Sequence, residues 1–133
     1  MSAAGALTGI SLDSLKDAFA GSEDILQQML LLFDVQARER MVQLKAALGG
    51  WEVTAARQCL HSLVNISGAV HGYGMSELTK ALGDAVKADN EAMAGELLLA
   101  LEREADLVLR QTGALLAALA SDPASVWSVQ LPD

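Results

Sequence analysis

Aromatic residues are scarce in this chain, although more than half of it is apolar. Aromatics make up 4% of the 133 residues, whereas hydrophobic residues make up 52%. The core must therefore consist mostly of leucine, alanine, valine and methionine, which suits packed helices better than strands. Both prolines, Pro123 and Pro132, lie near the C-terminus, so no strong helix breaker interrupts the chain before them.

Basic residues are few, and the net charge of −8 disfavours several classes of partner. We do not expect nucleic-acid binding, because the neutralisation of phosphates needs a concentrated basic surface. Anionic membrane surfaces are disfavoured for the same reason. The single cysteine, Cys59, excludes an internal disulfide and fits a reducing compartment.

A targeting segment and a long apolar run are also lacking. The N-terminal stretch MSAAGALTGISLDSL has neither the basic start nor the continuous apolar region of a signal peptide. The most apolar run, ILQQMLLLF, is too short to span a bilayer and contains two glutamines. We therefore expect a cytoplasmic protein with one domain, because this length suffices for a single sizeable core.

The chain does contain an unbroken helical periodicity from Ser11 to Ala120, with apolar residues at steps of three and four. One short helix and four long ones are predicted over about 11–20, 22–48, 51–71, 75–88 and 90–120. Short loops between long amphipathic helices make neighbours antiparallel. The expected fold is all-α, an up-and-down antiparallel four-helix bundle with a short extra N-terminal helix. A loose lead over 1–10 precedes the domain at 11–120.

The helix predicted over 22–48 carries apolar residues on more than one side. Its expected core stripe consists of Ile25, Met29, Leu32, Phe33, Ala37, Met41, Leu44 and Leu48. Leu26, Leu30, Leu31 and Val35 lie off this stripe. Contact with the first and last helices would cover them, and the alternative is a dimer or docking surface.

The C-terminal tail, 121–133, differs in composition from the helices. Trp127, Val129 and Leu131 alternate with other residues there. The tail is expected either to lie extended over the bundle or to be mobile.

Both histidines fall in the stretch QCLHSLVNISGAVHGYGMSEL, residues 58–78. On a helical wheel His61 lies roughly 120° from the centre of the apolar stripe and projects into water. His71 lies at the helix end, where it would cap carbonyls or fill the end of the bundle. The two are ten residues apart without a cysteine or carboxylate cluster, which argues against a metal site. On the wheel alone, His61 is either an ordinary surface residue or a nucleophile that accepts a group from a partner.

The segment CLHSLVNISGAVHGYGMSELTKAL, residues 59–82, resembles the signature of histidine phosphotransfer (HPt) domains of two-component phosphorelays. That family reads His-x-x-Lys-Gly-Ser, then a small or apolar stretch, Gly-Ala, and a helix with Leu-x-x-Leu spacing. The matching residues are His61, Leu63, Ser67, Gly68, Val70, Met75, Leu78 and Leu82. The flanking stretches ALGGWEVTAARQCLHSL and LGDAVKADNEAMAGELLLALEREADLVL also resemble the family, so the resemblance covers about 11–120.

The resemblance implies a phosphorelay carrier that is phosphorylated on His61. A receiver-domain phosphoaspartate would give its phosphoryl group to Nε2 of His61, which would pass it to another receiver. Such a carrier is a phosphotransfer intermediate without kinase activity of its own. It needs no metal or cofactor, because Mg²⁺ is expected on the partner receiver. The implied partners are response-regulator receiver domains and a hybrid sensor kinase.

The expected neighbours of the phosphoryl group are Arg57, Gln58, Val64, Asn65 and Gly68. Val64 stands where the family has its lysine, and Asn65 stands where it has a glycine. Arg57, one turn before the histidine, would supply part of the missing charge, and Asn65 would donate a hydrogen bond. Two alternatives remain. One is a non-catalytic HPt-like module that binds a receiver or kinase, and the other is an unrelated helical interaction bundle.

Overall fold

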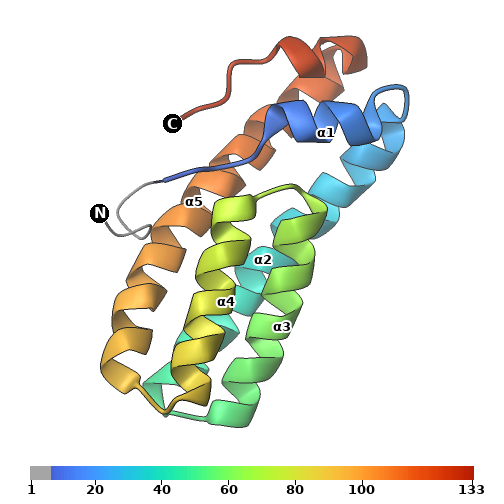
Figure 1. The fold of residues 1–133 in the computed structure, drawn as a ribbon. Helices are drawn as coiled ribbons and strands as arrows, with labels where there is room; N and C mark the ends of the chain where they lie inside the picture. The colour runs from blue at the N-terminus through green and yellow to red at the C-terminus, as the bar shows by residue number, and fades with distance from the viewer. Residues whose placement is uncertain (1–6) are drawn as a thin grey trace.

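The computed structural model describes residues 7–133, and over this range the chain is all-helical (Figure 1). The elements are α1 (Leu12–Phe19), α2 (Glu23–Gly49), α3 (Val53–Ala69), α4 (Tyr73–Lys87), α5 (Glu91–Ser121) and the 3-10 helix η2 (Pro123–Ser128). The all-α prediction is confirmed, and the helix ends differ from the predicted ones by a few residues. None of the helices between residues 7 and 133 has the length and hydrophobicity that a bilayer span requires.

Each long helix packs against the next one along the chain, and α5 returns to pack against α2 (Figure 1). α2 and α5, with 27 and 31 residues, extend beyond the shorter pair of α3 and α4. α1 and η2 cover this extension, with α1 against α2 and η2 against α5. The buried core is aliphatic, as the composition predicts, and Phe33 is the single buried aromatic side chain in the described range.

The core stripe predicted for α2 is partly wrong. Ile25 and Leu32 are 51% and 56% exposed, whereas Leu26 and Leu30 are fully buried. Because the first half of α2 is apolar on more than one side, the helical wheel is compatible with two different buried stripes there. The helix buries the one that continues directly into Phe33.

The lead predicted to be loose is fixed in its described part. The buried carboxylate of Glu104 accepts hydrogen bonds from the backbone N–H of Thr8 at 2.9 Å and of Gly9 at 2.6 Å. Thr8 also comes so close to α4 that a Cβ added at Gly74 would lie 2.7 Å from the threonine Cβ. Ile10 is buried, so the packed region begins before residue 11. Residues 1–6 of the predicted lead lie outside the described residues.

The C-terminal tail packs against α5, but its first part is the 3-10 helix η2 instead of an extended segment. Val126 is fully buried, and Trp127 Nε1 donates a hydrogen bond to Glu23 Oε2 at 3.2 Å. Glu23 Oε2 also accepts from the Gly21 N–H at 2.7 Å. The backbone bond from Gly21, followed by the Trp127 bond, lowers the pKa of Glu23 from its usual value. Gln111 joins both chain ends, because its side chain accepts from Ile10 N and donates to the backbone oxygen of Pro132.

The three connections between the long helices share one conformation. Trp51, His71 and Asp89 have φ values of 49°, 58° and 57°, in the left-handed region that glycine usually occupies. In each turn the next residue's N–H reaches back to the helix, as Gly72 N does to Ser67 O at 2.9 Å. The equivalent bonds are Glu52 N to Ala47 O and Asn90 N to Ala85 O. None of these three left-handed positions is a glycine.

Two of these turns are tied together by their side chains. Trp51 Nε1 donates a hydrogen bond to Asp89 Oδ1 at 2.6 Å, which joins the α2–α3 turn to the α4–α5 turn. Asp89 therefore combines an unfavourable backbone conformation with a favourable side-chain contact.

Substitution of Asp89 should separate the backbone effect from the side-chain effect. Asp89→Ala and Asp89→Gly both lose the acceptor for Trp51, but only glycine suits the left-handed backbone. We expect Asp89→Gly to be more stable than Asp89→Ala by about 1 kcal/mol in urea denaturation. Asp84 in the ordinary helical backbone of α4 is the matched control. There the order should reverse, because alanine favours a helix over glycine by about 1 kcal/mol.

Candidate functional site

His61 lies near the middle of α3 and is exposed to solvent, as predicted. The helix buries Ala56, Leu60, Leu63 and Ser67 against the other helices. Because these residues repeat at three- and four-residue steps, the adjacent position 61 is left on the outer side. The imidazole is therefore accessible to another protein without any change in the fold.

The helix that carries His61 is held to α4 by a buried polar contact. Ser67 Oγ donates to the Leu63 carbonyl at 2.6 Å and lies 2.8 Å from Ser76 Oγ, and both serines are buried. Gly72, between them in the chain, packs close to this point, because an added Cβ would meet Ser67 O at 3.5 Å. The α3–α4 hairpin is thus fixed at its turn, which sets the level at which α4 residues face His61.

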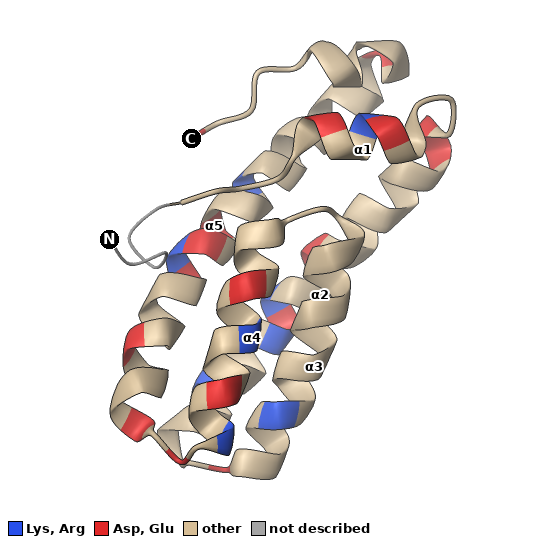
Figure 2. Ribbon diagram, viewed as in Figure 1, with Lys and Arg blue, Asp and Glu red and all other residues tan. Residues whose placement is uncertain are grey.

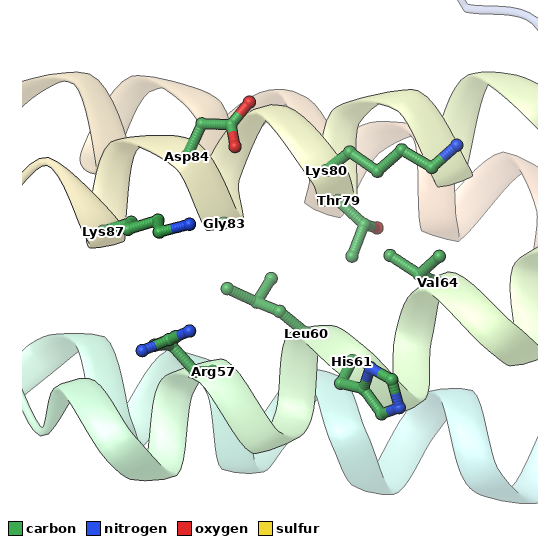
Figure 3. Close-up of a pocket in the computed structure, with 9 residues that line it drawn as sticks. All are labelled: Arg57, Leu60, His61, Val64, Thr79, Lys80, Gly83, Asp84 and Lys87. Carbon is green, nitrogen blue, oxygen red and sulfur yellow. The ribbon is translucent and has the colours of Figure 1, made fainter.

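A groove of about 300 Å³ runs along the α3–α4 seam, with His61 at its edge (Figure 3). It is lined by Arg57, Leu60, His61, Val64, Thr79, Lys80, Gly83, Asp84 and Lys87. Leu60 and Val64 point from α3 toward α4 and stand between the two helices (Figure 3). Val64 is half-buried there, so its methyl groups close the seam.

Three cationic side chains line the groove. Of the nine Lys and Arg residues in the chain, Arg57, Lys80 and Lys87 line it. Figure 2 shows basic positions on both α3 and α4. Lys80 Nζ lies 3.5 Å from Glu77 Oε1, whereas Arg57 and Lys87 form no ion pair with any residue of the described range. Asp84 contributes one carboxylate to the same groove.

The predicted neighbours of His61 divide between two sides of α3. Arg57 and Val64 line the groove with His61. Gln58 instead lines a shallow depression on the outer side, with Thr54, Arg57 and His61. Asn65 and Gly68 are exposed one and two turns after His61 but line neither hollow. His61 and Arg57 therefore belong to both surfaces. Gln58 lines the depression and also a hollow between α2 and α3, and Asn65 and Gly68 are exposed beyond the groove.

His71 lies at the end of α3, as predicted, and is half-buried. Its carbonyl accepts a hydrogen bond from Ser11 N at 3.1 Å, and its Nδ1 lies 3.1 Å from the Tyr73 hydroxyl. The ring also meets Phe19 edge-on, with 6.4 Å between centroids. These contacts give His71 a structural position between α1 and the α3–α4 turn.

Reasoning from the sequence missed the α4 side of the groove. The residues concerned are Thr79, Lys80, Gly83, Asp84 and Lys87. Their spacing of three and four places them on one side of α4, next to its buried residues. A tight turn near residue 71 also places position 61 beside position 81. The sequence could therefore have predicted that His61 lies next to this segment of α4.

The arrangement provides a nucleophile and positive charge but little else. A neutral imidazole nitrogen can attack an electrophile, and nearby cations stabilise an anionic group attached to it. No carboxylate of the described range is hydrogen-bonded to His61 to act as an orienting partner. The remaining chemistry of a reaction at this ring would thus come from another molecule.

Comparison of the chain with protein-family models, with curated proteins and with solved structures gives no match.

Proposed function

We propose that this protein is a phosphorelay carrier of the HPt type, phosphorylated on His61. The proposal rests on the sequence resemblance over about 11–120 and on the exposed imidazole beside a cationic groove. In this reading, α2 to α5 form an up-and-down antiparallel four-helix bundle, and α1 is the short extra helix. The protein would work in the cytoplasm between a hybrid sensor kinase and response-regulator receiver domains.

The proposed reaction is an in-line transfer between two side chains. Nε2 of His61 attacks the phosphorus of a receiver phosphoaspartate, so that a P–N bond forms and the P–O bond to the aspartate breaks. The aspartate leaves as a carboxylate, and a second receiver reverses the step. The receiver supplies Mg²⁺ and the acidic site, while this chain supplies the nucleophile and groove cations.

The observation that carries the proposal is that Arg57 and Lys87 line the same groove as His61. A phosphoryl group on His61 would bring about two negative charges to a protein whose net charge is already −8. Such a group needs local positive charge. Arg57 and Lys87 lie at the same end of the groove (Figure 3) and are free of ion pairs in the described range.

Phosphorylation assays with the purified protein test the proposal. Receiver domains phosphorylated with acetyl phosphate, and phosphoramidate as a small direct donor, should each produce an acid-labile, base-stable phosphate on the protein. His61→Gln should abolish this label with both donors, whereas His71→Gln should keep it. A label that survives in His61→Gln, or no label from either donor, would contradict the proposed function.

The groove charges should set how much phosphohistidine is present at equilibrium with a receiver. An exposed ion pair contributes roughly 0.2–1 kcal/mol, so Arg57→Ala and Lys87→Ala should each lower the transfer equilibrium constant about 1.4- to fivefold. Asp84→Asn should raise it by a similar factor, because it removes a like charge. Arg103→Ala on α5, which is exposed and lines none of the surfaces around His61, is the control and should have no effect.

Alanine substitutions at two glycines near the site should separate an effect on stability from an effect on partner access. A Cβ added at Gly83 meets nothing within 4 Å, and one added at Gly68 meets only Ser76 Oγ at 4.0 Å. Alanine at either position should therefore raise the free energy of unfolding, by up to about 1 kcal/mol, because it favours a helix. Gly113→Ala in α5, where a Cβ also meets nothing, should stabilise the fold similarly.

The rate of phosphoryl transfer from a receiver should distinguish these variants. Gly68→Ala and Gly83→Ala should slow transfer from a receiver, because the added methyl groups stand where the partner must approach. Gly113→Ala should leave the transfer rate unchanged. Equal transfer rates for all three variants would show that the small residues beside His61 have no role in docking.

A further inference from the structure

α2 carries a stripe of apolar residues that remains exposed in the fold. Ile25, Leu32, Val35 and Val42 recur at steps of seven, three and seven residues, so they share one side of the helix. They are 51%, 56%, 59% and 72% exposed. We call these four residues the outer stripe. Because α3 and α5 pack against other sides of α2, the outer stripe faces away from the core.

The outer stripe is complementary to itself when a second copy of α2 lies antiparallel to it. If the helices cross midway between Leu32 and Val35, these two residues face each other twice. Ile25 then faces Val42 of the other copy, so apolar residues meet apolar residues at both ends. The positions between them, Gln28 and Glu39, would also face each other, and an amide can donate to a carboxylate.

The charges beside the outer stripe support the same alignment. Asp24 of one copy would approach Lys45 of the other, and symmetry repeats this pair. The Lys45 side chain is 69% exposed, and its present partner, Glu102, lies 3.5 Å away at the surface. A hollow of about 450 Å³ between α2 and α5 borders Val42 and Lys45. Met41 and Leu109 also line this hollow, so it offers an apolar surface for Ile25 of the second copy.

We propose that the outer stripe of α2 is a homodimer interface, in which two copies pair antiparallel along this helix. The interface is independent of the proposed function. His61 lies on α3 at the edge of the α3–α4 groove, whereas the outer stripe belongs to α2. The dimer would therefore leave both His61 sites accessible.

Sedimentation velocity of the full chain between about 1 and 500 µM tests the dimer. We expect a concentration-dependent dimer for the unmodified protein and a monomer for Leu32→Glu, since the charge falls at the centre of the interface. Leu99→Glu on α5 is the matched control, because Leu99 is 58% exposed and lies outside the outer stripe. This variant should dimerise normally, and circular dichroism should show the same helix content in all three proteins.

Charge reversal tests the alignment of the two helices. Asp24→Lys and Lys45→Asp should each weaken the dimer about two- to thirtyfold, because each change disrupts two surface ion pairs. The double variant should recover most of the loss, since it restores opposite charges across the interface. A monomeric wild-type protein, or a dimer that Leu32→Glu leaves intact, would overturn the proposal. A double variant no tighter than the single ones would overturn the antiparallel alignment.

Discussion

The left-handed turns at Trp51, His71 and Asp89 are the constraint on which the helix arrangement depends. Each turn reverses the chain within three residues, and the residue after the left-handed one is the N-cap residue of the next helix. Non-glycine residues pay about 1–3 kcal/mol for this conformation. Contacts of the same side chains offset that cost, namely the hydrogen bond between Trp51 and Asp89 and the packing of His71 on Phe19 and Tyr73. The connections are therefore short and rigid, and they determine which residues of neighbouring helices stand level.

Most of the helices could be predicted because their signals are local. Ser11 and Asn90 cap α1 and α5 with their side chains, as their positions before apolar periodic segments indicate. The outward side of α2 could not be predicted, because an apolar residue appears on every side of its first half and only packing selects the buried one. The fixed N-terminal segment also escaped, since it depends on Glu104, about a hundred residues away in the chain. A buried carboxylate that accepts backbone hydrogen bonds has no short-range sequence signature.

One half of the candidate site follows from the periodicity of a single helix, and the other half requires the pairing of two helices. The exposed position of His61 follows from the periodicity of α3, and Arg57 and Val64 follow from it at one-turn spacing. Lys80 and Lys87 belong to another helix, and their place beside His61 depends on how α3 and α4 pack. A helical wheel describes one helix at a time, so the prediction placed all the neighbours of the phosphoryl group on α3. The position of the turn at residue 71 determines which residues of α3 and α4 lie side by side.

In the proposed function, Val64 stands where HPt domains have a lysine, and its surroundings give a physical reason for a valine there. Val64 points toward α4 and is half-buried in the seam, so an ammonium group there would have to extend past Thr79 to reach water (Figure 3). The valine instead closes the seam with apolar surface. The unpaired positive charge of the groove lies toward the opposite end, on Arg57, one turn before His61, and on Lys87 of α4. In the proposed function, valine at position 64 would let α3 and α4 pack tightly beside His61. Cations from both helices, Arg57 and Lys87, would then stabilise the phosphoryl group.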